Sequence, residues 1–414
     1  MVTGCVRAGV RSARDVLAFA AVVFLSITDG WAQDAHHGGK SAAARPAGLG
    51  SSAAFAPDDA LWLAGVDRNK RLFVLTSRDD GHRWSGPRTI DTAQDEVAAD
   101  GDSRPKIAFG PNGQVAIAYT NPFDKPYTGR IRLLRSVDGG RSFAPPVTVH
   151  GDRQIVTHRF ESIAFDRKGR LHVVWIDKRD AEEARRGAPA AAAKSAYAGA
   201  AVYRSVSKDG GLSFGPDTKL ADHSCECCRI ALVADADGAL VALWRHVFAP
   251  NIRDHAFARF GALNVAPVAP VRATFDDWAI DACPHHGPGL AAAAAGGYHA
   301  VWFGERAGQP AVRYSRLGSD GRPVGATQVL PDEQAEHADV LSAGARVVIA
   351  WRSFDGKTTR LRAWVSEDDG RHFMLRELAS DTGDNDHPRL ASDGARILAV
   401  WRTTKDVHVI NVAP

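Results

Sequence analysis

Pairs of short strands recur along the whole chain. In each pair apolar and polar residues alternate, a glycine turn follows, and a second alternating stretch ends on a large aromatic residue, as in RPKIAFGPNGQVAIAY and FESIAFDRKGRLHVVW. Six of these closing aromatic residues, spaced 49 to 69 residues apart, are Tyr119, Trp175, Trp244, Trp302, Trp351 and Trp401. Residues 51–66 form a weaker seventh copy.

This repetition predicts an all-β fold. Short alternating strands at a regular spacing, without helical periodicity, are typical of four-stranded antiparallel sheets repeated around an axis. The seven strand pairs favour a β-propeller of seven blades over residues 51–414, with six blades as the alternative. The Ala-rich segment from Lys178 to Ala200 is expected to be an insertion within one blade that forms a short helix.

A second motif, Ser-x-Asp-x-Gly-x-x-aromatic, occurs four times. Its aspartate can accept hydrogen bonds from the backbone of its own turn, its glycine can take a positive φ, and its aromatic residue can pack against the blade. We therefore expect the four copies on hairpin turns. Their residues are Ser77, Asp79, Gly81 and Trp84; Ser136, Asp138, Gly140 and Phe143; Ser207, Asp209, Gly211 and Phe214; and Ser366, Asp368, Gly370 and Phe373.

These four copies resemble the Asp-box (BNR) repeats of sialidases and related propellers. The resemblance implies the fold and says little about chemistry, because Asp boxes lie on turns away from the active centre. Enzymes of that family clamp a carboxylate with three arginines and use a tyrosine nucleophile paired with a glutamate, together with an aspartate acid/base. Arg104, Arg229 and Arg389, each at the start of a first strand, are candidates for the clamp. The family's Phe-Arg-Ile-Pro motif is absent, and Tyr314 is the least poor match to the nucleophile.

The N-terminus predicts export. Three arginines precede an apolar run from Val16 to Leu25, and Gly30 and Ala32 are small residues before a cleavage site at Gln33. We expect residues 1–32 to be a signal peptide, residues 33–50 to be a flexible His-, Ala- and Gly-rich lead-in, and the mature protein to be periplasmic or secreted without a membrane span.

Composition narrows the partners. The net charge of +3 is small for 414 residues and no basic cluster accompanies it, which argues against a nucleic-acid partner. A hydrophobic content of 45% with 24% charged residues is that of a globular protein, and we expect a monomer.

Cysteines and histidines gather at the starts of successive first strands. Equivalent starts in a propeller lie around one mouth of the central channel, so these residues are expected to meet there. The predicted site contains Cys225, Cys227, Cys228, Cys283, His285 and His286, with His158, His337 and His387 as further members of the ring.

Thiolates and imidazoles favour a soft or borderline ion. We interpret the site as one that binds copper, favoured as Cu(I), with zinc as the alternative, for metal handling or delivery together with a metal-donor or metal-acceptor protein. Two alternatives remain open. One is a sialidase-type glycoside hydrolase. The other is a glycan- or protein-binding propeller whose four cysteines form disulfides and hold no metal.

Overall fold

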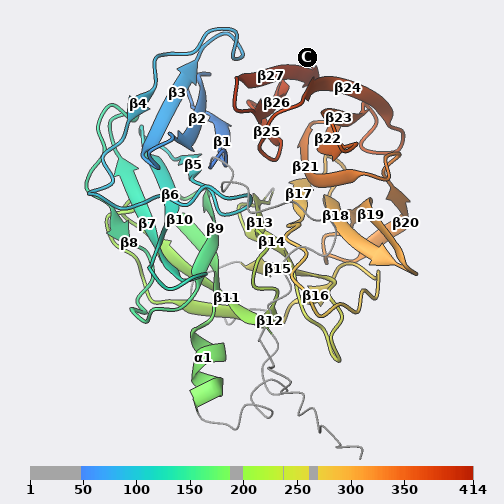
Figure 1. The fold of residues 1–414 in the computed structure, drawn as a ribbon, viewed down its shortest axis with the longest axis horizontal. Helices are drawn as coiled ribbons and strands as arrows, with labels where there is room; N and C mark the ends of the chain where they lie inside the picture. Colours follow the sequence, from blue (N-terminus) through green and yellow to red (C-terminus); the bar gives the residue numbers. More distant parts are fainter. Residues whose placement is uncertain (1–47, 187–198, 236, 261–268, 414) are drawn as a thin grey trace, which may run out of the picture. The chain divides into compact units, whose positions relative to one another are not determined.

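Seven antiparallel sheets account for the part of the chain that the structure describes, residues 48–186, 199–235, 237–260 and 269–413 of a computed structural model. Figure 1 shows the sheets arranged radially, with the first strand of each nearest the centre. The predicted seven-blade propeller is therefore confirmed and the six-blade alternative is wrong. The predicted signal peptide and nearly all of the lead-in lie outside the described residues, so both stay predictions.

The strands follow one another outward from the centre in every blade. Blade 1 contains β1 (Ser52–Phe55), β2 (Leu61–Val66), β3 (Leu72–Ser77) and β4 (Arg88–Thr89). Blade 2 contains β5 (Lys106–Phe109), β6 (Val115–Pro122), β7 (Gly129–Ser136) and β8 (Val147–Thr148). Blade 3 contains β9 (His158–Phe165), β10 (Leu171–Asp177), β11 (Ala200–Ser207) and β12 (Thr218–Ser224).

Blades 4 to 7 repeat the same order. Blade 4 contains β13 (Ala231–Ala234), β14 (Leu240–Arg245), β15 (His255–Phe260) and β16 (Val271–Arg272). Blade 5 contains β17 (Gly289–Ala292), β18 (Tyr298–Arg306), β19 (Gln309–Leu317) and β20 (Pro323–Val329). Blade 6 contains β21 (Ala335–Ala343), β22 (Arg346–Phe354), β23 (Thr359–Ser366) and β24 (Met374–Asp381), and blade 7 contains β25 (Arg389–Ser392), β26 (Ile397–Arg402) and β27 (Val407–Ala413).

The core lies between the blades. Each blade presents one face to its predecessor and the other to its successor, so second strands such as β10 are buried along their full length. Seven separate apolar clusters result, one at each boundary between blades. The six predicted closing aromatic residues lie in these clusters and are almost entirely removed from solvent.

Side chains close the ring between blades 7 and 1. Blade 7 has three strands within the described residues, and none of them is contributed by the N-terminal segment. Leu61 and Leu63 instead pack against Leu398 and Val400 across this seam. Among the residues that the structure describes, packing and polar contacts therefore close the ring without a shared strand.

The four Asp boxes lie on turns between the third and fourth strands of blades 1, 2, 3 and 6, as predicted. Their glycines also contact the preceding blade. Gly140 of blade 2 has a φ of 79°, and a Cβ at this position would lie 2.5 Å from the ring of Trp62 in blade 1. A Cβ on Gly81 of blade 1 would likewise clash with Val409 of blade 7, so one Asp box lies on the seam between blades 7 and 1. Each box thus braces its own turn and docks that turn on its neighbour.

The predicted insertion contains the short helix α1 (Arg179–Arg186), which follows β10. Asp177 accepts a hydrogen bond from the backbone N–H of Arg179 and so caps the first turn. No helix in the described ranges has the length and apolar character needed to cross a membrane.

Replacing the Asp-box residue Asp209 with alanine should lower the melting temperature at neutral pH. Although partial burial opposes the shift, hydrogen bonds from Ser213 and Ser207 lower the pKa of Asp209 to about 2. The stabilisation is present above the unfolded pKa of about 4 and disappears as the pH falls toward 2. Thermal unfolding of both proteins from pH 7 to pH 2 tests this, with Lys208→Ala as the neighbouring control. A difference in melting temperature that persists unchanged at pH 2 would contradict it.

Candidate functional site

One buried carboxylate, that of Asp102, joins several blades at the channel mouth. Asp102 precedes β5, and its Oδ1 accepts hydrogen bonds from Arg229, which precedes β13, at 3.0 Å and from Arg389 of β25 at 3.3 Å. The backbone N–H of Gly287, before β17, donates to Oδ2 at 3.2 Å. A Cβ on Gly287 would lie 2.2 Å from Cγ of Arg229, so this approach requires glycine. We call Asp102, Arg229, Gly287 and Arg389 the hub.

Electrostatics keep Asp102 ionised. Burial alone would raise its pKa, but the charge of Arg229, the contact with Nδ1 of His387 at 3.5 Å and the charge of Arg389 hold it well below the usual range. Burial and the nearby positive charges of Arg104 and Arg229 lower the pKa of Arg389 to about 9. The hub is therefore a carboxylate surrounded by an excess of guanidinium groups.

Arg104 forms a second buried ion pair next to the hub. Its side chain is fully buried and contacts both carboxylate oxygens of Asp386 at 2.9 Å. It also donates to the backbone oxygens of Gly101 and Ser51, while Ser51 donates to Asp386 from its backbone and its hydroxyl. This network connects the segment before β1 to the segment before β25 and so lies on the seam.

The three arginines proposed for a carboxylate clamp do converge, but they differ in their free donors. The guanidinium of Arg229 donates hydrogen bonds to Asp102 and to the backbone oxygens of Pro288 and Ala338. Arg104 is equally occupied. Arg389 makes one hydrogen bond, to Asp102, and its other ionic contact, with Asp339, is 3.9 Å long. Arg389 is thus the member of the three that retains donor capacity for a ligand.

Three imidazoles stack beside the hub. The ring of His337 lies 3.4 Å from that of His387 and 4.2 Å from that of His286, whose other face stacks on Phe303. Burial, reinforced by neighbouring positive charges, lowers the pKa of His286 to about 3 and those of His337 and His387 well below their usual range. The histidine stack therefore resists protonation at physiological pH, and neutral rings of this kind can accept hydrogen bonds.

A carboxylate and a further arginine flank the stack. Glu336 lies 3.7 Å from Nε2 of His337 and 2.8 Å from Nε of Arg352. One ligand atom from each of His286, Glu336 and His337 lies within 4.8 Å of the others, which is a spacing that could also hold a metal ion. The side chains of Glu336 and Arg352 are about one-fifth exposed, so solvent reaches this edge of the site.

A lysine and a glutamate from adjacent inner strands lie close to the hub. Lys106 of β5 donates to the backbone oxygens of Asp102 and Arg104, and Glu161 of β9 accepts from Thr120 at 2.8 Å. Burial lowers the pKa of Lys106 to about 7 and raises that of Glu161. Sequence reasoning missed both residues. Lys106 begins a strand whose other residues are apolar, which is a signal that could have found it, whereas β9 also contains His158, Arg159 and Ser162, so Glu161 gave no such signal.

The four cysteines meet in a separate group, the thiol cluster. Cys225, Cys227 and Cys228 lie in the loop before β13, and their Sγ atoms are 3.6, 3.8 and 3.9 Å apart. The Sγ of Cys283, from the loop before β17, lies within 4.8 Å of those of Cys225 and Cys227. Hydrogen bonds from the neighbouring thiols lower the pKa of Cys225 well below its usual range.

Other candidates take separate places. His285 is exposed with a φ of 54°, while His158 is buried between Asp152 at 2.9 Å and the backbone oxygen of Gly129. The hydroxyl of Tyr314 forms a hydrogen bond with Nδ1 of His299, and its ring packs on Phe373 of an Asp box, away from the channel mouth. The structure therefore divides the predicted ring into the thiol cluster, the histidine stack, an exposed His285 and a separate His158, which stacks on His150.

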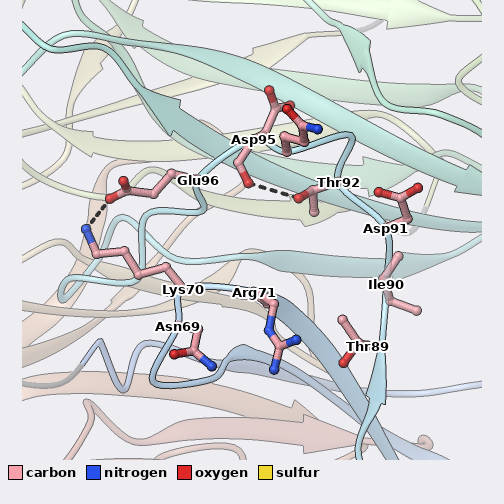
Figure 2. A pocket seen from close by; sticks show the side chains of 10 residues that line it. Asn69, Lys70, Arg71, Thr89, Ile90, Asp91, Thr92, Asp95 and Glu96 are labelled. Carbon is pink, nitrogen blue, oxygen red and sulfur yellow. Dashed lines mark hydrogen bonds and ion pairs between the residues drawn. The ribbon is translucent and has the colours of Figure 1, made fainter.

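A surface pocket also opens between the β2–β3 turn and the segment that follows β4. Figure 2 shows it lined by Lys70, Thr92 and Glu96, with an ion pair between Lys70 and Glu96. None of the residues lining it belongs to the hub or to the histidine stack.

Comparison with known proteins places the fold. No family model and no curated protein matches the sequence. An ulvan lyase, a polysaccharide lyase solved with -[GlcA(1-4)Rha3S]-, has a TM-score of 0.54 at 11% identity over 89% of this chain and 91% of that one. A leech intramolecular trans-sialidase complexed with 2,7-anhydro-Neu5Ac gives 0.51 at 8% identity over 86% and 83%. An α-L-arabinofuranosidase from Fusarium graminearum gives 0.50 at 13% identity over 74% and 88%.

The chain thus has the fold of sialidase-like and related seven-blade propeller enzymes. This finding corrects the metal-handling interpretation of the sequence, because the solved propellers that it resembles are carbohydrate-active enzymes. Donor atoms at a channel mouth indicated which ligands could bind there, but not what the protein does with them.

Proposed function

We propose that this protein is an enzyme that cleaves an acidic glycan at the channel mouth. The observation that carries the proposal is Arg389, a guanidinium with unused donors beside Arg104 and Arg229 and next to neutral imidazoles. A sugar carboxylate at Arg389 would gain charge-assisted hydrogen bonds and relieve the repulsion among the arginines. Support also comes from the fold, since the similar ulvan lyase and trans-sialidase structures hold acidic sugars.

The histidine stack supplies the proton chemistry in this proposal. His286 is half-buried at the end of the stack, and its Nδ1 has no hydrogen-bond partner. The negative charge of a substrate bound at Arg389 would raise the low pKa of His286, so that the neutral ring can accept a proton from that substrate. Glu336 with Arg352 forms a second polar group at the same edge. Tyr314 takes no part because it braces an Asp box.

Replacing Arg389 with methionine should raise KM for an acidic glycan by about 10- to 100-fold, because a charged hydrogen bond to the substrate is lost. Polymeric uronic-acid glycans are assayed by the ultraviolet absorbance of unsaturated products and by release of reducing ends, and a fluorogenic sialoside is assayed in parallel. A neutral glycan gives the matched comparison. Turnover that is unaffected by Arg389→Met, or binding of acidic glycans without any cleavage, would refute the proposal.

His286→Ala should lower kcat by about 100-fold or more, as expected for loss of an acid–base group. The exposed neighbour His285 offers the control, and His285→Ala should keep the wild-type rate. Equal losses in both variants would assign the effect to the loop rather than to proton transfer.

A further inference from the structure

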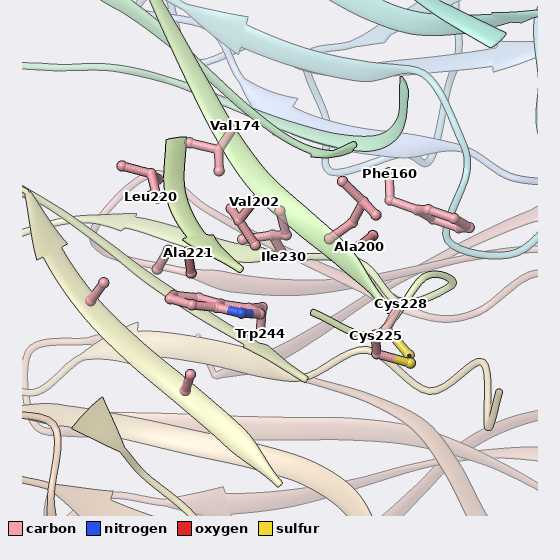
Figure 3. Packing of buried hydrophobic residues seen from close by; sticks show 14 of the residues in the cluster. Phe160, Val174, Ala200, Val202, Leu220, Ala221, Cys225, Cys228, Ile230 and Trp244 are labelled. Carbon is pink, nitrogen blue, oxygen red and sulfur yellow. Dashed lines mark hydrogen bonds between the residues drawn. The ribbon is translucent and has the colours of Figure 1, made fainter. Parts of the chain in front are cut away.

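The thiol cluster lies outside the proposed carbohydrate site and serves no step of its chemistry. Three of its members come from only four consecutive positions, and the fourth comes from a loop 55 residues further along the chain. Cys225, Cys227 and Cys228 are buried, and Figure 3 shows the sulfur atoms of Cys225 and Cys228 side by side at the end of an apolar cluster. Four thiols brought together from two loops need a physical reason to share one small volume.

The spacing of three of the sulfur atoms matches one face of a tetrahedral metal site. With metal–sulfur bonds of about 2.3 Å, the edge of a regular tetrahedron is about 3.8 Å. The three edges among Cys225, Cys227 and Cys228 are 3.6, 3.8 and 3.9 Å. Cys283 lies within 4.8 Å of Cys225 and Cys227 but further than that from Cys228, so its side chain must move toward Cys228 to supply the fourth corner. A planar three-sulfur site with the same bond length would open the edges to about 4.0 Å.

The surroundings suit thiolates. Arg253 directs Nη1 toward the Sγ of Cys225 at 3.6 Å, which places a positive charge next to the sulfur atoms. The backbone N–H of Cys225 bonds the carbonyl oxygen of Arg245, so the loop is fixed where its three side chains converge. No histidine is needed to complete the ligand set.

We propose that Cys225, Cys227, Cys228 and Cys283 bind one Zn²⁺ ion as a structural site. The ion joins the loop before β13 to the loop before β17, and so ties blade 4 to blade 5. Cys228 directly precedes Arg229 of the hub, and Cys283 lies three residues before His286. The ion therefore fixes the two loops that carry Arg229 and His286 to the channel mouth, although the ion itself lies outside the proposed carbohydrate site. A structural ion stays bound, whereas the corrected metal-handling function required an ion that is released.

Metal analysis tests the site on the full chain, purified without reductant or added metal. The expected result is one zinc per chain. After removal of the ion, Co²⁺ should bind in its place and give the intense sulfur-to-cobalt charge-transfer absorption of a tetrahedral thiolate site. Two disulfides in the protein as purified, stoichiometric copper instead of zinc, or reduced protein that takes up neither Zn²⁺ nor Co²⁺ would each overturn the proposal.

Variants separate metal binding from folding. Cys283→Ser changes the least buried ligand and should leave the propeller folded while weakening Zn²⁺ affinity by at least about 100-fold in competition with a chelator. Glu226→Gln, in the loop that contains Cys225, Cys227 and Cys228, removes a charge but no thiol and should bind Zn²⁺ as the wild type does. Unchanged affinity in Cys283→Ser, with a wild-type circular-dichroism spectrum, would contradict the four-thiolate site. Neither result depends on glycan cleavage, so the two proposals fail independently.

Discussion

Replacing Asp102 with asparagine is expected to lower the free energy of unfolding by about 3–5 kcal/mol, because it leaves buried guanidinium groups without their counter-charge. Arg229 and Arg389 both donate to Oδ1 of Asp102, and their other acceptors are neutral backbone oxygens or a distant carboxylate. Guanidinium-chloride unfolding, followed by tryptophan fluorescence, measures the change.

The wild-type protein should also lose this stabilisation in acid. Since the folded pKa of Asp102 is depressed, its contribution is present above about pH 4 and declines below that value.

Asp100→Asn is the matched control for this prediction. Asp100 lies two residues away, but its side chain is 73% exposed and its contact with Arg159 is 3.3 Å long. Its substitution should cost less than about 1 kcal/mol. Similar losses in the two variants would show that the hub is not a buried charge network.

Arg104→Met should open the seam between blades 7 and 1, with a loss of about 3–5 kcal/mol. The substitution leaves Asp386 buried with only the two hydrogen bonds from Ser51 and its own local contacts. Combining it with Asp386→Asn should recover part of the loss, because the double variant no longer buries an unpaired charge. Chemical denaturation of the two single variants and the double variant gives the coupling energy.

A second ion pair on the same seam provides the control for Arg104. Arg396 pairs with Asp80 at 2.7 Å, and both side chains are partly exposed, so Arg396→Met should cost about 1 kcal/mol or less. If Arg104→Met is no more destabilising than Arg396→Met, the seam is held by its apolar layer alone.

Local patterns were sufficient to predict the fold. Alternation with a period of two, closing residues such as Trp175 and Trp401, and the Asp-box turns are all short-range features, and the structure places them as expected. The seven strand pairs also gave the number of blades. Arg104, Arg229 and Arg389 were proposed as a clamp from the family resemblance and from their positions at strand starts. The equivalence of strand starts in successive blades explains why they converge.

The chemistry of the mouth could not be predicted in the same way, because it depends on contacts between blades. Asp102 belongs to no motif, and its role follows from meeting Arg229, 127 residues away, and Gly287, 185 residues away. His158 shares its position in the repeat with other ring candidates but is bound by Asp152 of its own loop. Equivalent positions in the repeat determine where the backbone of a residue lies, whereas its local partners determine which contacts its side chain makes.

The docking of Asp-box turns on preceding blades has a consequence for how the molecule comes apart. Each blade is coupled chiefly to its two neighbours, as in a one-dimensional array of repeats. A linear array frays from its ends, where a terminal repeat is held on one side alone. Here the contact of Gly81 with Val409 gives the first blade the same kind of neighbour that Gly140 with Trp62 gives the second. The array therefore has no ends, and the release of any single blade requires two interfaces to break together. A linear array of the same length could lose its repeats one at a time, whereas this ring should unfold cooperatively.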